Sequence, residues 1–121
     1  MKRILLVEDD PLIVEIYTTQ LEKAGFQVDS AIDGEIAFEK AKNERFDLLV
    51  LDIVLPFVTG FEVLRKIRNQ EELKNLKVLI LSNLSQKSDM EMAKNLGAIK
   101  YLVKAHYTPS EVVEEIKKAL K

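Results

Sequence analysis

The sequence of 121 residues contains no cysteine and only one histidine, His106. Without cysteine, the chain cannot form disulfides, zinc–thiolate sites, iron–sulfur clusters or a thiol nucleophile. One histidine cannot build a multi-histidine metal site, and His106 falls in an expected surface loop, where we assign it no catalytic role. Any metal that this chain binds is therefore expected to have oxygen ligands.

Long apolar runs and a strong charge bias are also missing. The most apolar segment, residues 48–58, is interrupted by Asp52 and Pro56, whereas a membrane-spanning helix needs about 20 apolar residues. The start, Met1-Lys2-Arg3, is followed by too short an apolar run for a secretory signal. The 18 basic and 20 acidic residues leave a net charge of -2 and form no basic stripe. We therefore expect a cytoplasmic protein that contacts neither nucleic acid nor membrane directly.

The composition is that of an ordinary globular protein, with 47% hydrophobic and 31% charged residues. The length fits one domain, which would bury roughly two-thirds of the unfolded surface. No linker, repeat or low-complexity segment divides the chain. We expect a single domain over residues 1–121, whose output passes through a partner unless the sequence is part of a longer protein.

Short apolar runs alternate with amphipathic stretches along the whole chain. Residues 4–7, 48–51 and 78–81 are uninterrupted apolar runs, which is typical of strands buried on both faces. Residues 28–32 and 101–103 are weaker strand candidates. Apolar residues at helical spacing follow each run, within residues 12–23, 36–41, 63–67, 90–96 and 112–120.

Proline and capping residues agree with these helices. Pro11 follows Asp10 and Pro109 follows Thr108, so each proline is expected to be the first helical residue after a cap. Thr108 and Glu111 have the spacing of a capping box. The glycines fall at predicted boundaries, before helices or where helices stop.

The alternation predicts an α/β fold in which a β-α unit is repeated five times. Such a (βα)5 chain forms a doubly wound parallel five-stranded sheet, commonly in the flavodoxin-like order 2-1-3-4-5. The switch point then lies between the first and third strands. A functional site is expected there, at the carboxyl ends of the strands.

Acidic residues converge on this predicted switch point. Glu8 and Asp9 follow the first strand, and Asp52 follows the third, inside an apolar run where a bare charge is costly. Two carboxylates about 4 Å apart repel by about 4 kcal/mol at an effective dielectric of 20. A hard cation, for which we expect Mg²⁺, would relieve this repulsion. The alternative is that the acids stay solvated near a helix N-terminus, as we expect for the cap residue Asp10.

Two further polar residues end predicted strands. Ser82 follows residues 78–81, and Lys104 follows residues 101–103. Taken singly, they would be a turn residue and a surface charge. Together with the acids they supply a hydroxyl and a cation that can bind anionic oxygens beside a metal. Asp52 could then attack phosphorus, so the set predicts a phosphoryl-transfer site.

With these motifs, the chain resembles the receiver domain of two-component response regulators, in its small, chemotaxis-regulator-like form. The resemblance covers essentially the whole chain. It rests on residues 4–11, on residues 51–56 with Gly60, on Ser82 and on residues 101–104, in this order. It implies that Asp52 accepts a phosphoryl group from the phosphohistidine of a histidine kinase or a phosphotransfer protein.

The resemblance also implies the metal ligands. Asp9 and Asp52 would bind Mg²⁺ directly, Glu8 would assist through water, and the backbone carbonyl of Val54 would complete the protein ligands. The domain would be a signalling switch that phosphorylates itself and not an enzyme with turnover of an external substrate.

For the switch itself, the resemblance implies that Ser82 and Lys104 contact the phosphoryl group and that Tyr101 changes rotamer with Ser82. Without that role, Tyr101 would be a half-buried aromatic residue on an edge strand. A downstream effector protein would read the active state. The chain itself would act as a monomer or as a phosphorylation-dependent homodimer. The surface expected to be read comprises residues 89–96, 100–103 and 109–120.

Two residues depart from the family pattern. Ala105 follows Lys104 where receivers usually have a proline in a cis peptide, and a non-proline cis bond would cost about 3 kcal/mol. The Lys104–Ala105 peptide is therefore either strained or trans. Asn83 stands where the family usually has a small residue, and we hypothesise that it partly covers Asp52 or donates to the phosphoryl oxygens.

Other residues bear on turnover and on competing functions. Val54 and Leu84 are apolar at the positions that flank the attacking water in the family, which predicts slow self-dephosphorylation. A degenerate receiver that only binds proteins is the main alternative, supported by Ala105 and Asn83 but opposed by the retained charged residues. A dehalogenase-type phosphohydrolase would need an aspartate where this chain has Val54.

Overall fold

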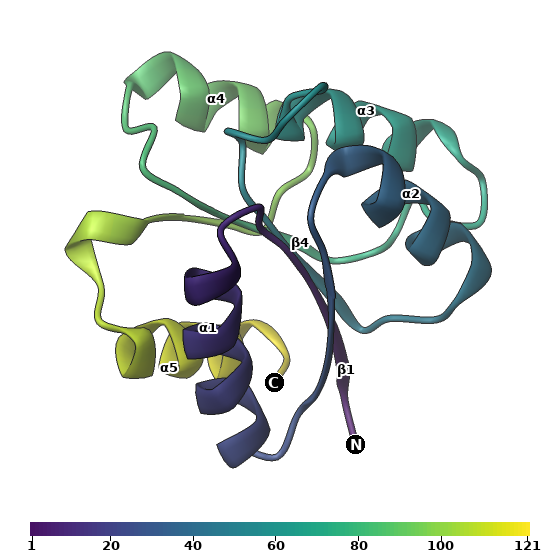
Figure 1. Cartoon of the computed structure of the whole chain (residues 1–121). Coiled ribbons are helices and arrows are strands. Elements are labelled where there is room, and N and C mark those ends of the chain that lie inside the picture. Colours follow the sequence, from purple (N-terminus) through teal and green to yellow (C-terminus); the bar gives the residue numbers. More distant parts are fainter.

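The computed structural model describes residues 1–121 and contains one five-stranded parallel sheet (Figure 1). The strand order β2-β1-β3-β4-β5 confirms the predicted doubly wound topology. The strands are β1 (Arg3–Val7), β2 (Gln27–Ala31), β3 (Leu48–Leu51), β4 (Val78–Ser82) and β5 (Lys100–Val103). The prediction placed β2 one residue too late, because Ile32 is apolar although it lies beyond the strand and is exposed.

Five α-helices cover the two faces of the sheet. They are α1 (Pro11–Lys23), α2 (Gly34–Asn43), α3 (Gly60–Asn69), α4 (Lys87–Asn95) and α5 (Pro109–Ala119). Figure 1 shows α1 and α5 on one face and α2, α3 and α4 on the other. A three-residue 3-10 helix, η1 (Lys104–His106), follows β5 and was not expected from the sequence. None of the helices is long and apolar enough to cross a membrane.

The predicted caps of the first and last helices are confirmed. Pro11 and Pro109 are the first helical residues, and the side chains of Asp10 and Thr108 accept hydrogen bonds from backbone N–H groups of the first turn. Thr108 and Glu111 form the capping box: each side chain accepts a hydrogen bond from the backbone N–H of the other residue, at 3.2 and 2.8 Å. These caps fix where α1 and α5 begin, close to the carboxyl edge of the sheet.

Gly34 and Gly60 are the first residues of α2 and α3 and do not precede these helices as expected. At Gly60 the reason is close packing, because a Cβ there would collide with the backbone of Asp52 and Ile53. The Gly60 N–H also donates to the carbonyl of Ile53 at 2.9 Å. The glycine therefore holds the start of α3 against the segment that follows β3.

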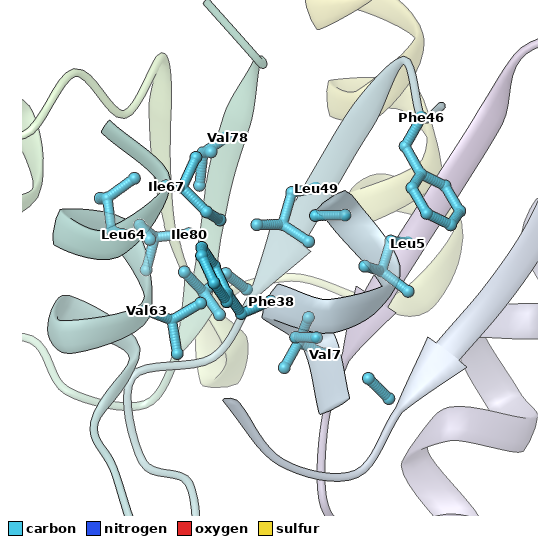
Figure 2. Close-up of a cluster of buried hydrophobic side chains, with 14 of the residues drawn as sticks. Leu5, Val7, Phe38, Phe46, Leu49, Val63, Leu64, Ile67, Val78 and Ile80 are labelled. Atoms are coloured by element: carbon cyan, nitrogen blue, oxygen red, sulfur yellow. The ribbon is translucent and has the colours of Figure 1, made fainter. Parts of the chain in front are cut away.

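The sheet is buried on both faces, as its uninterrupted apolar strands predict. One cluster of 17 buried residues lies between the sheet and α2, α3 and α4 (Figure 2). A second cluster of 12 lies between the sheet and α1 and α5. Alternate residues of β1 divide between them: Leu5 and Val7 face the first cluster, and Ile4 and Leu6 face the second.

Helix α4 is held with little apolar burial, since Ala93 is its only buried residue. Arg68 of α3 supplies a polar anchor instead. Its guanidinium donates to carbonyls at the end of α4 and in the segment before β4, those of Leu96, Gly97, Lys74 and Leu76. Burial lowers the pKa of Arg68, and no carboxylate pairs with it. The C-terminal end of α4 is thus tied to α3 through one side chain.

Candidate functional site

Polar residues from four strands meet at one edge of the sheet. Glu8 follows β1, Asp52 follows β3, Ser82 is the last residue of β4, and Lys104 follows β5. The final residues of β1 and β3 are register partners, so the two acids leave the sheet at the same level. The site therefore lies at the predicted switch point.

Lys104 joins the two buried acids. Its Nζ lies 2.5 Å from Glu8 Oε1 and 2.6 Å from Asp52 Oδ2. Glu8 is 3% exposed and Asp52 is 5% exposed. The other carboxylate oxygens accept backbone hydrogen bonds: Glu8 Oε2 from Asp10 N–H and Asp52 Oδ1 from Val54 N–H, both at 3.1 Å. Both carboxylates are thereby fixed in orientation.

The charges of this triad do not balance, because two carboxylates share one ammonium group. Burial raises the pKa of Glu8, against the opposing effect of the hydrogen bond from Lys104, and the charge of Asp52 adds to the rise. Burial alone would lower the pKa of Lys104, but its hydrogen bonds with Asp52 and Glu8 outweigh this and raise the pKa. By formal charge, the triad thus carries one more negative than positive charge, and the raised pKa of Glu8 reflects its burial and this imbalance.

The structure does not gather the expected metal ligands into a three-acid cluster. Glu8 and Asp52 come together around Lys104, whereas Asp9 is exposed beside them and makes no hydrogen bond with either. The donor set nevertheless fits a hard divalent cation. The carboxylates of Glu8, Asp52 and Asp9 are oxygen donors, and Lys104 does not neutralise all of their charge.

Ser82 and Tyr101 are linked through Leu84, in the segment after β4. Ser82 is fully buried, and its Oγ accepts a hydrogen bond from Leu84 N–H at 3.4 Å. The Tyr101 hydroxyl donates to the carbonyl of the same Leu84 at 2.7 Å. Burial raises the pKa of Tyr101 to about 12, with smaller effects from Asp89 and Asp52. Both side chains are therefore anchored on one backbone residue.

Asn83 and Ala105, the two residues that depart from the family pattern, contact each other. The side-chain Oδ1 of Asn83 accepts a hydrogen bond from Ala105 N–H at 3.0 Å. The Lys104–Ala105 peptide is trans, because the chain contains no cis peptide bond. Of the two geometries that the sequence left open at this peptide, the structure has the unstrained one.

Tyr17 of α1 belongs to the surroundings of the site and was missed by the sequence reasoning. It is buried, and burial raises the pKa of its hydroxyl, which also senses the charges of Lys104, Glu8 and Asp52. It lines a groove of about 290 Å³ beside the triad, with Ile13, Ile16, Asn83, Lys104, Ala105 and Pro109. The sequence signal that could have identified Tyr17 is its spacing of four residues from Ile13, which places both on the same face of the first helix.

The segment after β3 carries backbone strain. Phe57 has a φ of 71° and is 91% exposed. The N–H of Val58 donates to the carbonyl of Pro56 at 2.8 Å, so these residues form a γ-turn around Phe57. The positive-φ form of this turn is rare and strained for a residue other than glycine.

The sheet places the chain in the class of flavodoxin-like, doubly wound α/β proteins. At its switch point are a buried aspartate, a second acid and a lysine. The comparisons with known proteins narrow this class to one family. The response regulator receiver domain matches residues 4–117, and the chain belongs to this family of signalling domains.

Curated relatives and solved structures agree with this assignment. The chain is 37% identical to the alkaline phosphatase synthesis transcriptional regulatory protein PhoP of Bacillus subtilis, over 99% of this chain and 49% of that protein. The master transcriptional regulator RpaA of Synechocystis is 38% identical over 86% of this chain and 43% of its own length. The chain thus spans about half the length of the curated relatives it matches.

Two solved structures show the likeness of the fold. The chemotaxis response regulator CheY4 of Vibrio cholerae superposes with a TM-score of 0.91 and 31% identity, over 99% of each chain. The response regulator protein TrrA of Thermotoga maritima, solved in complex with Mg²⁺ and BeF, gives a TM-score of 0.85 and 35% identity over 98% of each chain.

Proposed function

We propose that this chain is a phosphorylation-dependent signalling switch whose phosphoacceptor is Asp52. The observation that carries the proposal is the triad, in which a buried aspartate is held against Lys104 at the switch point of a receiver fold. An oxygen of Asp52 would form a bond to phosphorus while the phosphorus–nitrogen bond of a donor phosphohistidine breaks. The electron pair of that bond returns to the imidazole of the donor.

The chain's own residues have separate tasks in this transfer. The Val54 N–H holds Asp52 Oδ1, which orients the carboxylate toward the crevice. Lys104 already contacts Asp52 Oδ2 and would pair with the phosphoryl oxygens after transfer. Ser82, whose hydroxyl now accepts from Leu84, would donate to the same oxygens. Two of these groups, the Val54 N–H and Lys104, already contact Asp52.

Mg²⁺ is the proposed cofactor. Asp9, Asp52 and the carbonyl of Val54 would bind it directly, with Glu8 acting through water. When bound, it would neutralise charge on the phosphoryl group. The support comes from the uncompensated negative charge of the triad and from the relative TrrA, which was solved with Mg²⁺ and BeF.

The proposed output is a change of the surface formed by α4, β5 and α5. Tyr101 and Ser82 are both anchored on Leu84, so a movement of Ser82 toward the phosphoryl group would release or reposition Tyr101. Phosphorylation signals only to the extent that it favours one packing over the other. The curated relatives PhoP and RpaA are transcriptional regulators, which supports a downstream effector as the partner. The switch would act as a monomer or as a phosphorylation-dependent homodimer.

The test is the intact mass of the protein after incubation with acetyl phosphate and Mg²⁺. A gain of one phosphoryl group is expected in the wild type and in the control Asp29→Asn, a substitution in the middle of β2 where the carboxylate pairs with Arg3 and not with Lys104. No gain is expected with Asp52→Asn or with EDTA. If neither acetyl phosphate nor a phosphorylated histidine kinase transfers a group to Asp52, the proposal fails and the degenerate, protein-binding receiver replaces it.

The lifetime of the adduct follows from the same site. Neither Val54 nor Leu84 can orient a water molecule with its side chain, and both are partly exposed at the crevice. We therefore propose that Asp52 phosphate hydrolyses slowly. Replacing Val54 with asparagine, which can hydrogen-bond a water, is expected to speed the loss of the phosphoryl mass. Equal rates in the two proteins would contradict this reasoning.

A further inference from the structure

The segments after β4 and β5 are joined by one side-chain hydrogen bond. Asn83 is the first residue after β4, and Ala105 is the second residue of η1. Asn83 Oδ1 accepts from Ala105 N–H at 3.0 Å. Because a backbone N–H can only donate, the Asn83 carboxamide must present its oxygen to Ala105. That oxygen is therefore bound to the segment after β5, which begins with Lys104.

This bond supplies what η1 lacks. A three-residue 3-10 helix is weak by itself, and its first N–H groups have no partner within the helix. The cap residue Val103 contributes no side-chain hydrogen bond, and the backbone bond that closes the turn, from Tyr107 N–H to Lys104 carbonyl, is long at 3.3 Å. Asn83 therefore acts as a cap that comes from a different segment.

Lys104 is the residue that this cap affects. Val103, before it, is fixed by its pairing with Ser82 in the sheet. After it, only η1 defines the path of the chain. The ammonium must reach both Glu8 and Asp52 from this backbone position, at 2.5 and 2.6 Å. A looser turn at Ala105 would let the Lys104 backbone, and with it the ammonium, shift away from the acids.

We infer that Asn83 is a positioning residue, which holds Lys104 in place through its hydrogen bond with Ala105 N–H. The inference rests on the proposed function, because Lys104 matters for transfer only if Asp52 is the phosphoacceptor. It differs from the two sequence-based hypotheses for Asn83, which were that it covers Asp52 or donates to the phosphoryl group.

The hydrogen bond itself is tested by NMR on the unphosphorylated protein. Asn83→Leu keeps the size of the side chain but removes the acceptor, and is expected to speed amide exchange at Ala105 by about fivefold, the factor for one typical hydrogen bond. Asn83→Asp keeps the acceptor and is expected to leave this exchange slow. The Lys104 Cε resonance should move in Asn83→Leu, which introduces no charge of its own. Unchanged Ala105 exchange in Asn83→Leu would overturn the inference, whether or not the protein accepts phosphoryl groups.

The effect on transfer is tested with a double-mutant cycle and acetyl phosphate. Asn83→Ala is expected to lower the second-order rate constant by about fivefold. Ala105→Pro removes the N–H donor, so adding Asn83→Ala to this variant is expected to change the rate no further. As a control, Asn69→Ala, at an exposed asparagine of α3 without a side-chain hydrogen bond, should behave as the wild type.

Three results would overturn the inference. An increase in rate with Asn83→Ala means that the side chain covers Asp52. A decrease that persists in the Ala105→Pro background means that it contacts the phosphoryl group directly. An unchanged rate means that Lys104 needs no such support. Loss of the adduct in the wild type itself would instead refute the proposed function and leave the NMR result to decide the hydrogen bond.

Discussion

Replacing Asp52 with asparagine is expected to stabilise the fold while it abolishes phosphorylation. Glu8 and Asp52 contact the same Nζ of Lys104, at 2.5 and 2.6 Å. Their contacting oxygens are thus at most about 5 Å apart, and two unit charges at that distance repel by about 3 kcal/mol at an effective dielectric of 20. Asparagine removes this repulsion and the burial cost of a carboxylate, which is several kcal/mol, but it loses the attraction to Lys104, about 6 kcal/mol at 2.6 Å and the same dielectric. The expected net gain is on the order of 1 kcal/mol in the free energy of unfolding.

The gain should depend on pH in a defined direction. The pKa of Glu8 is raised in the folded protein, so the folded state binds this proton more tightly than the unfolded state does. Wild-type stability therefore falls as pH rises from the ordinary range of a glutamate through the raised pKa of Glu8. Asp52→Asn removes the part of this rise that the Asp52 charge causes. The advantage of the variant should grow from mildly acidic to neutral pH.

The assay is urea unfolding with EDTA, because guanidinium would screen the charges and divalent cations would bind the acids. Glu115→Gln is a control in which the free energy of unfolding is expected to change in the opposite direction. One acid there pairs with two lysines, Lys100 and Lys118, and hydrogen bonds with them lower the pKa of Glu115. Its removal should lower stability at neutral pH. The reasoning is refuted if Asp52→Asn is less stable than the wild type at neutral pH, or if its gain is the same at both pH values.

Three further predictions concern other parts of the chain. Arg68→Met should lower the free energy of unfolding by about 2 kcal/mol, because four backbone carbonyls lose their donor; Arg65→Met, the control, should change little in thermal unfolding. Phe57→Gly should raise stability by about 1 kcal/mol in urea, since glycine adopts positive φ without steric cost; a loss would show that the ring is held by contacts. In an ultraviolet titration, the Tyr101 phenol should ionise only near pH 12, and earlier ionisation would contradict the burial that raises its pKa.

The fold could be predicted from the sequence because each level of the pattern agrees with the others. The uninterrupted runs at residues 4–7, 48–51 and 78–81 indicated strands buried on both faces, and the sheet has a core on each side of it. Pro11 and Pro109 marked helix starts through covalent geometry alone. The location of Asp52 at the switch point followed from the strand order, and the structure places it there.

The contacts within the site could not be predicted in the same way. Spacing assigns a residue to the end of a strand, but not the atoms that it contacts there. The sequence therefore grouped Glu8, Asp9 and Asp52, whereas in the structure Lys104 lies between two of them and Asp9 remains exposed. A three-residue helix such as η1 is too short to show periodicity. The hydrogen bond between Asn83 and Ala105 depends on η1, so it could not be predicted from the sequence either.

The charge imbalance at the triad joins the stability of the domain to its proposed function. Lys104 neutralises only one of two buried carboxylates, so the folded state keeps a negative charge that would be removed most cheaply by a proton or a cation. By the gain predicted for Asp52→Asn, selection for stability alone would favour an asparagine at position 52. Under the proposed function, the same excess charge would favour binding of Mg²⁺ beside the nucleophilic carboxylate of Asp52. The stability gained by Asp52→Asn is thus a measure of what the domain gives up to keep a reactive carboxylate.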